Sequence, residues 1–231
     1  MIQFIIVGWH FENFPDFISS LLEIKNNNPE VVKVFWSCHK EPSQRIKDNF
    51  DYKVFPNLGL EDGAYQQALD YLDIPDETFL FLMHDDLEVK DWDFINECLQ
   101  RLAAGYYFVG NGRNYPADID PGRLVLGKPT IEYVKEEAKY LFTEPMMCFT
   151  IRESFLCTMR KYLKQIHDFE VVWEEPVADE NGKFHIGGIG NLQQALLGYK
   201  LTKIFPDKVS YLSDTYQDSD WLYECARGAK A

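Results

Sequence analysis

Short continuous apolar runs alternate with longer periodic segments along the first part of the chain. Residues 2–7, 31–38 and 78–83 are runs of strand length, rich in β-branched and aromatic side chains, which is typical of buried parallel strands. Between them, residues 14–28 and 63–72 repeat their apolar side chains at helical spacing. This order of strand, helix and strand predicts right-handed βαβ units.

The pattern continues to residue 110 and then weakens. After the third run we expect a helix that is capped by Asp91 and stopped by Gly105, followed by a fourth strand at 106–110. In the second half we expect helices and strands in this order: a helix at 130–139, a strand at 145–151, a helix at 152–166, and strands at 201–205 and 208–212. The predicted fold class is α/β: an open, mainly parallel twisted sheet with helices on both faces, a Rossmann-like three-layer sandwich. We expect one domain, residues 1–231, with halves 1–110 and 111–231.

The net charge and the positions of the cysteines limit the kinds of partner and compartment that we expect for this chain. The formal net charge is −14 over 231 residues, so the chain would repel a phosphate backbone, and we expect no nucleic-acid partner. A phosphate-bearing ligand would need a local cation or backbone N–H groups. The five cysteines are scattered and predict no disulfide framework. The apolar start, residues 1–8, is too short for a signal peptide and no later run reaches the length of a membrane span, so we expect a cytoplasmic protein.

The candidate chemistry follows the predicted strands. In open α/β sheets the ligand lies beyond the carboxyl ends of the strands, where this chain carries three polar turns. They read Gly8-Trp9-His10, Ser37-Cys38-His39 and His84-Asp85-Asp86. In the third turn, two carboxylates and an imidazole could hold Mn²⁺ or Mg²⁺, with phosphate oxygens completing the coordination. The alternative interpretation of the same turn is a solvated acidic loop.

The third turn and its flanks resemble a known family. Residues 79–92, FLFLMHDDLEVKDW, resemble the strand, Asp-x-Asp motif and helix of the GT-A glycosyltransferases, especially those of family two. Residues 55–72, 145–155 and 195–207 resemble further segments of that family in the same order. The resemblance implies a metal-dependent transfer of a sugar from a nucleotide-diphosphate donor to a hydroxyl acceptor, which could be a glycan, a lipid-linked molecule or a protein. We expect residues 1–110 to bind the nucleotide sugar and 111–231 to bind the acceptor, because the second half is the irregular part of the chain.

The resemblance assigns roles to single residues. Asp86 matches the last Asp of the motif and would hold the metal and contact the sugar diphosphate. His84 stands at the first Asp and would ligate the metal or accept a ribose hydroxyl, while Asp85 would reach the donor sugar. The resemblance also implies donor contacts from Asn57 and Asp62, with Gln66 in the following helix. Gly8, Trp9, Ser37 and His39 are further donor-binding candidates because they directly follow the first two predicted strands, although Ser37 and His39 stand where the family has an acidic residue. The alternative interpretation of Asp62 is a helix cap.

The general base is the least defined part of the predicted site. An inverting transfer needs a carboxylate to take the proton of the acceptor hydroxyl, yet residues 187–194 read GGIGNLQQ where the family has an acidic pair. Glu174 and Glu175 are the nearest candidates, and His185 is a candidate third metal ligand. The alternative interpretation of Glu174 and Glu175 is a solvated loop, and that of His185 is a structural histidine.

Two other functions remain open at this stage. One is a nucleotide or sugar binding protein that has kept the fold and lost the base. The other is a sugar nucleotidyltransferase, which would need a Gly-rich basic loop after the first strand, where this chain reads GWHFENFPD.

Overall fold

The structure of the 231-residue chain is a computed structural model. It describes residues 1–9, 11, 15–89, 91–110, 113–114, 150–151, 155–169, 197, 201, 204–212 and 222–224. No helix within these residues has both the length and the apolar character needed to cross a membrane.

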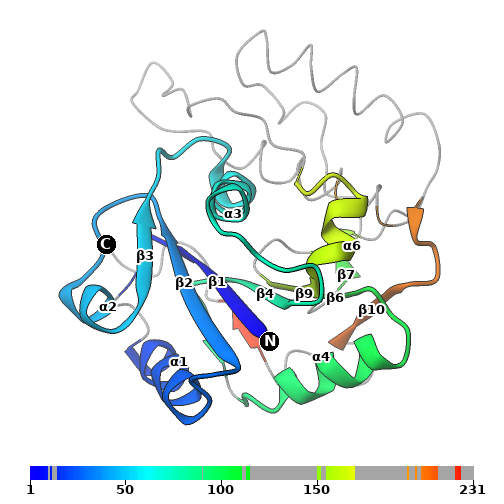
Figure 1. Cartoon of the computed structure of the whole chain (residues 1–231), viewed down its shortest axis with the longest axis horizontal. Coiled ribbons are helices and arrows are strands. Elements are labelled where there is room, and N and C mark those ends of the chain that lie inside the picture. Colours follow the sequence, from blue (N-terminus) through cyan, green and yellow to red (C-terminus); the bar gives the residue numbers. More distant parts are fainter. Residues whose placement is uncertain are drawn as a thin grey trace, which may run out of the picture.

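A seven-stranded sheet forms the centre of the molecule, in the order β10-β6-β9-β4-β1-β2-β3 (Figure 1). The strands are β1 (Ile2–Gly8), β2 (Val32–Cys38), β3 (Asp51–Val54), β4 (Phe79–His84), β6 (Phe108–Gly110), β9 (Phe155–Met159) and β10 (Val209–Tyr211). Neighbouring strands run parallel except where β9 pairs with β4 and β6. This confirms the predicted open, mainly parallel sheet.

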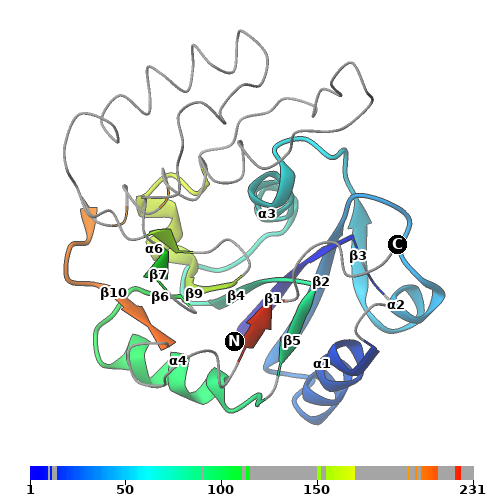
Figure 2. The ribbon, with the colours of Figure 1, turned by 180° about the vertical axis from the view of Figure 1, so that it is seen from behind.

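Helices cover both faces of this sheet (Figures 1 and 2). One face carries α1 (Pro15–Asn27) and α4 (Phe94–Ala103), and the other carries α3 (Leu60–Tyr71) and α6 (Arg160–Gln165). The short helix α2 (Gln44–Asn49) connects β2 to β3. Two small antiparallel pairs complete the described chain: β5 (Leu87–Val89) with β11 (Leu222–Glu224), and β7 (Arg113–Asn114) with β8 (Thr150–Ile151).

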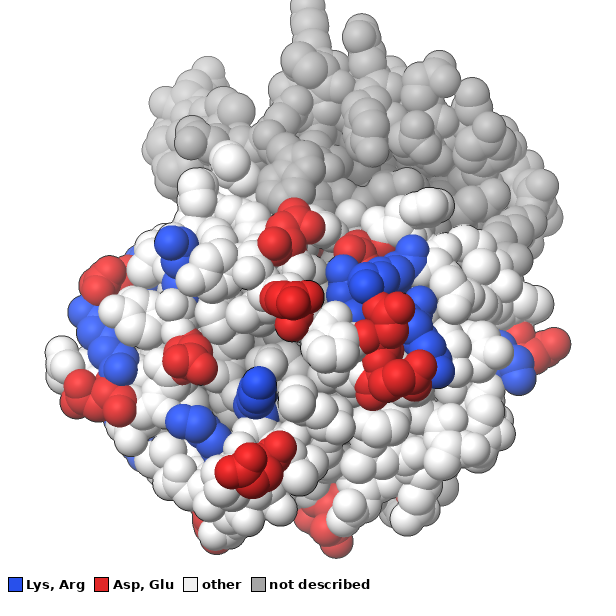
Figure 3. Space-filling view, in the orientation of Figure 1, with Lys and Arg blue, Asp and Glu red and all other residues white. Residues whose placement is uncertain are grey.

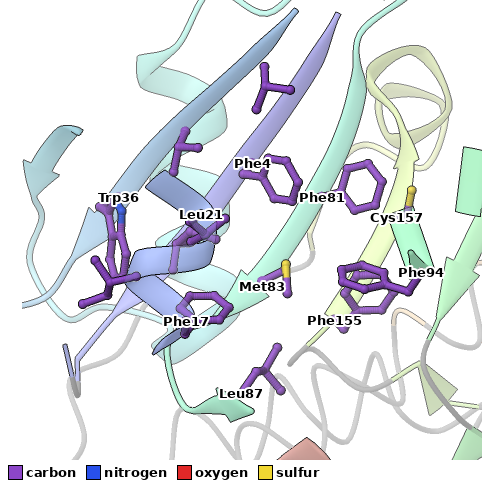
Figure 4. Packing of buried hydrophobic residues seen from close by; sticks show 14 of the residues in the cluster. Phe4, Phe17, Leu21, Trp36, Phe81, Met83, Leu87, Phe94, Phe155 and Cys157 are labelled. Carbon is purple, nitrogen blue, oxygen red and sulfur yellow. The ribbon is translucent and has the colours of Figure 1, made fainter. Parts of the chain in front are cut away.

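The core has two halves because successive side chains of a strand point to opposite faces. Phe4 and Ile6 of β1 pack toward α1 and α4, whereas Ile5 and Val7 pack toward α3 and α6. On the first side, Phe4 stacks on Phe81 with 4.9 Å between ring centroids, as Figure 4 shows. Burial on both faces explains why these strands are continuous apolar runs.

The α3 and α6 face is tied to the sheet at its surface as well. Lys161 and Lys164 of α6 pair with Glu77 and Asp76 in the turn before β4. Acidic and basic side chains are interspersed on the described part of the face in Figure 3.

Two predictions for the second half are wrong. Residues 152–166 were expected to form one helix, but 155–159 form strand β9 and α6 spans only Arg160–Gln165. The run FLCTM is inserted between β4 and β6, and the apolar pattern of a short segment buried on both sides does not distinguish a strand from a helix. Leu201 and Ile204 are helical where a strand was expected. The expected helix at 130–139 lies outside the described residues.

Smaller differences concern helix starts. Helix α3 begins at Leu60, three residues before the predicted start, and Asp93 rather than Asp91 stands at the N-cap position of α4. Asp91 instead accepts a hydrogen bond from the Asp93 backbone N–H at 2.9 Å.

Candidate active site

The carboxyl ends of three central strands meet at one edge of the sheet. In the strand register Gly8 lies beside Cys38, and Val7 lies beside His84. Because the strands are parallel, the polar turns that follow β1, β2 and β4 are neighbours. The N-terminus of α3 lies at the same edge, since the Ser37 hydroxyl donates a hydrogen bond of 2.7 Å to the Ala64 carbonyl. The structure thus brings together the three turns that the sequence singled out.

His84 and Asp86 form the pair best suited to a cation. Nδ1 of His84 lies 3.6 Å from Oδ1 of Asp86, and the two residues are only 4% and 5% exposed. A separation of 3.6 Å is too long for a good hydrogen bond. It is close to the roughly 3.0–3.4 Å between two atoms that share one ion at about 2.1 Å from each. The carboxylate oxygen is a ligand type that suits Mn²⁺ or Mg²⁺, and the imidazole nitrogen can ligate Mn²⁺ but is a poor ligand for Mg²⁺.

The pair does not by itself make a complete cation site. Within the described residues no three His, Cys, Asp or Glu side chains gather closely enough to hold a metal ion. The other ligands would have to come from a bound phosphate, from water, or from another part of the chain. His185, the candidate third ligand, lies outside the described residues.

Asp62 is a buried carboxyl group beside this pair. It lies in the first turn of α3 and is 2% exposed, and its Oδ1 has no hydrogen-bond partner within the described part of the chain. Burial raises the pKa of Asp62 to about 7, although the neighbouring His84 opposes this shift. Gly59 stands at the N-cap position of α3, so the interpretation of Asp62 as the helix cap is wrong. Its carboxyl group is therefore available to accept a hydrogen bond from a ligand.

His39 is held as a neutral ring by its surroundings. Its Nε2 lies 3.2 Å from the Leu60 carbonyl, which can only accept, so Nε2 carries the hydrogen and Nδ1 has the lone pair. Burial lowers the pKa of His39, with the nearby carbonyls opposing and His84 adding to the shift. Nδ1 of His39 and Oδ1 of Asn57 are both buried without a hydrogen-bond partner among the described residues. Both atoms can accept a hydrogen bond from a bound molecule.

Trp9 is an exposed aromatic residue at this edge. It is 41% exposed, its ring meets that of His39 edge-on at 6.2 Å, and Nζ of Lys40 lies 5.1 Å from its ring centroid. The preceding Gly8 allows the loop to pack closely, because a Cβ at that position would stand 2.5 Å from the ring of Phe11. Trp9 therefore offers a flat apolar surface at the mouth of the site.

Asp85 turns toward the loop that follows β1. Its Oδ2 accepts hydrogen bonds from the backbone N–H groups of Trp9 and Phe11, at 2.9 and 2.7 Å. Its own backbone N–H donates to the Val7 carbonyl at 3.1 Å. Cys38 lies nearby, and its pKa rises to about 12 through burial first and then through the charges of Asp85 and Glu41, so it remains a thiol.

Tyr65 lies beside His84 but was not among the site residues predicted from the sequence. Tyr65 is buried in α3 and stacks between His84, at 6.1 Å, and Phe169, at 5.4 Å. Its place in a helix that buries small residues such as Ala64 and Ala68 was the sequence feature that could have identified Tyr65. Gln66 accepts a hydrogen bond from the Phe169 backbone N–H at 3.1 Å. Glu174 and Glu175 lie outside the described residues.

Comparison with known proteins gives only distant structural similarity. No protein-family model matches the chain, and no curated protein matches it either. The chain is similar to glucosyl-3-phosphoglycerate synthase from Mycobacterium tuberculosis in complex with phosphoglyceric acid, with 13% identity over 91% of this chain and 69% of the other and a TM-score of 0.49. It is also similar to mannosyl-3-phosphoglycerate synthase from Rubrobacter xylanophilus, with 11% identity and a TM-score of 0.46. That match covers 70% of this chain and 54% of the other, so this chain spans about half of its length.

A third similar structure is core-mannan synthase A from Aspergillus fumigatus in its Mn/GDP form. It has 12% identity over 92% of this chain and 73% of the other, with a TM-score of 0.44. These structures are glycosyltransferases, the class of protein that the sequence resembles. All three TM-scores are below 0.5, so these similarities do not indicate the function of this chain.

Proposed function

We propose that this protein is a glycosyltransferase that moves a sugar from a nucleoside-diphosphate donor to a hydroxyl acceptor and that uses Mn²⁺ or Mg²⁺. The observation that carries the proposal is the buried pair of His84 and Asp86 at the carboxyl end of β4, 3.6 Å apart. This is the edge of an open α/β sheet where ligands bind. His84 and Asp86 would hold the cation.

Charge explains why a cation belongs in this proposal. Asp62, Asp85 and Asp86 are all buried at the edge where the donor would bind, and the whole chain carries a formal net charge of −14. A diphosphate placed there would be repelled by the carboxylates. When bound, a divalent cation would offset that repulsion and stabilise the charge that develops on the leaving diphosphate.

The remaining donor contacts are proposed from exposure and hydrogen-bonding capacity. Trp9 would stack on the flat nucleobase, because it is an exposed aromatic side chain at this edge. His39 Nδ1, Asn57 Oδ1 and Asp62 Oδ1 would accept hydrogen bonds from N–H or hydroxyl groups of the nucleoside or sugar. Gly8 would allow close approach of the loop, and Ser37 would hold α3 in place through its bond to Ala64.

The acceptor is assigned to the second half, residues 111–231, and the donor to residues 1–110. We assign proton removal from the acceptor hydroxyl to Glu174 or Glu175, and a further cation contact to His185. In this scheme the carboxylate takes the hydroxyl proton as the acceptor oxygen attacks the sugar carbon and the diphosphate leaves.

A second candidate function is a nucleotide-sugar binding protein without turnover. The observation that favours it is the stretch GGIGNLQQ at residues 187–194, which has no carboxylate where the family that the chain resembles has its base. The two candidates share the donor site and differ only in the release of nucleotide when an acceptor is present.

A ligand panel tests both candidates. The melting temperature is measured with UDP, GDP, CDP and dTDP, each with Mn²⁺, with Mg²⁺ and with a chelator. A ligand at about 100 times its Kd adds about 2.7 kcal/mol, which at this chain length raises the melting temperature by roughly 5–10 °C. We expect such a rise with one nucleotide and only with the cation. An equal rise in the presence of the chelator would contradict the metal-dependent site.

Turnover is then measured as nucleotide released from the matching nucleotide sugar when hydroxyl acceptors are added. Release that depends on the acceptor supports the transferase. Donor binding without release supports the binding protein.

A further inference from the structure

The carboxylate of Asp85 is already engaged within the protein. It lies between the two residues proposed to hold the cation, yet its Oδ2 points to the loop after β1 and accepts two backbone N–H groups, from Trp9 at 2.9 Å and from Phe11 at 2.7 Å. Asp85 is only 3% exposed. Hydrogen bonds to a charged, buried acceptor are stronger than neutral ones, so this contact fixes the loop.

The loop has the geometry of a small anion-binding turn. Two N–H groups two residues apart converge on one oxygen, and Phe11 has φ of 37°, a left-handed backbone conformation that is unusual for a residue other than glycine. Such concave turns bind anions. Here the anion is the carboxylate of Asp85.

The same turn determines where two aromatic side chains lie. The ring of Phe11 is buried against Gly8 and Trp36, with 6.2 Å between the centroids of Phe11 and Trp36. Trp9, two residues earlier, remains exposed with its ring edge-on to His39. With Phe11 buried and both N–H groups bonded to Asp85, the backbone of Trp9 is held at the carboxyl edge, beside His39.

We propose that Asp85 is a positioning residue: it holds the loop after β1 so that Trp9 contacts the ligand, and it does not itself touch the donor. This inference rests on the proposed function for the identity of the ligand. It replaces the role in sugar contact that the resemblance implies for Asp85. The positioning role also connects the cation pair to Trp9. Asp85 lies between His84 and Asp86 in the chain, and it accepts a hydrogen bond from the backbone N–H of Trp9.

Hydrogen exchange tests the positioning role without any ligand. In Asp85→Ala we expect the backbone amides of Trp9 and Phe11 to exchange at least about tenfold faster than in the wild type, because they lose a buried acceptor. Asp85→Asn keeps one oxygen at the same position without the charge and is expected to give an intermediate rate. Asp73→Ala, a substitution of an exposed aspartate in the loop before β4, is the matched control and is expected to leave both amides unchanged.

A double-mutant cycle tests whether Asp85 acts through Trp9. The affinities of UDP, GDP, CDP and dTDP in the presence of Mn²⁺ are measured for Asp85→Ala, Trp9→Ala and the double variant. We expect each single change to weaken binding about tenfold, as for loss of one stacked aromatic ring, and the double variant to be no weaker than the worse single one. Mn²⁺ alone is still expected to bind Asp85→Ala, more weakly by the loss of one nearby charge, because His84 and Asp86 are unchanged. If that variant does not fold, Asp85→Asn takes its place.

The possible outcomes separate this inference from the proposed function. Additive losses of about hundredfold in the double variant, or loss of Mn²⁺ binding in Asp85→Ala, would overturn the positioning role, as would unchanged exchange at Trp9 and Phe11. If the wild type binds none of the four nucleotides, the proposed function fails, while the exchange experiment still decides whether Asp85 holds the loop.

Discussion

The two ends of the central strands β1, β2 and β4 differ sharply in what they bury. At the carboxyl edge the buried side chains include four ionisable groups, His84, Asp85, Asp86 and, from α3, Asp62. At the amino edge a cavity of about 470 Å³ opens between α1 and α4, and its floor consists of apolar side chains such as Ile2, Phe4 and Val32. The acidic residues that line this cavity, Asp91 and Asp93, are exposed.

This difference indicates which edge carries the function. An ionised side chain that leaves water costs several kcal/mol unless it is paired, so a chain concentrates such groups only where something compensates for them. The amino edge carries this cavity, yet the described side chains that line it include no buried ionisable group. This contrast supports the proposal of a reactive site at the carboxyl edge, because buried ionisable groups are a better indicator of such a site than cavity volume.

The largest expected effect comes from the apolar end. Phe4 is fully buried and stacks on Phe81, so Phe4→Ala removes a ring from the core and should lower the free energy of unfolding by about 3–5 kcal/mol. Denaturant unfolding measures this loss. Under conditions where the variant is folded, its nucleotide affinity in the presence of Mn²⁺ should equal that of the wild type. A parallel loss of affinity would show that the two edges do not act separately.

The next effect comes from the polar end and should show the opposite behaviour. Asp86→Asn keeps the shape of a buried side chain and removes its charge, so we expect a folded protein whose Mn²⁺-dependent nucleotide affinity falls at least about hundredfold, or about 2.7 kcal/mol. Calorimetry of nucleotide binding with and without Mn²⁺ measures this. Asp93→Asn, at the exposed amino edge, is the matched control and should bind as the wild type does. Equal affinities in both variants would remove the argument for a cation at Asp86.

Much of this contrast could be predicted from the sequence. Apolar runs located β1, β2 and β4, and the rule that ligands bind beyond the carboxyl ends of parallel strands selected His84, Asp85 and Asp86 before any contact was known. The rule works here because it depends only on strand direction, which the βαβ pattern determines. The same rule predicted that Trp9 and His39 lie at this edge, and the pairing of Gly8 with Cys38 agrees with it.

Other features depend on contacts between distant parts of the chain, which a pattern does not contain. The bonds from Trp9 and Phe11 to Asp85 join residues 76 and 74 positions apart, and nothing in HDDL indicates that its middle carboxylate turns toward the first loop. Strand β9 was predicted as helix because its apolar run is short and its partners, β4 and β6, lie far away in sequence. Asp62 was open to two interpretations until the left-handed Gly59, with φ of 74°, was seen at the N-cap position.

The smallest expected effect concerns Asp62, a buried carboxyl group whose pKa lies near neutrality. Burial raises the pKa of Asp62 from 3.8 to about 7, and the nearby His84 opposes this shift. The folded state therefore binds this proton more tightly than the unfolded state, so Asp62 costs stability as the pH rises from about 4 to about 7 and costs nothing further above that range. Asp62→Asn removes the ionisation and should gain stability over the wild type as the pH increases.

The measurement is the free energy of unfolding of both proteins at pH 5, 6, 7 and 8, in chelator so that no cation is bound. Since one unit of pKa displacement corresponds to about 1.4 kcal/mol, the difference between variant and wild type should grow by at least about 1 kcal/mol from pH 5 to pH 8. Asp73→Asn, at an exposed aspartate, should show no such trend. A difference between Asp62→Asn and the wild type that stays constant with pH would mean that Asp62 is already ionised in the folded chain at pH 5. The carboxyl edge would then hold a partner for the Asp62 carboxylate. The two edges would still differ, but the charge of Asp62 would be a paired one.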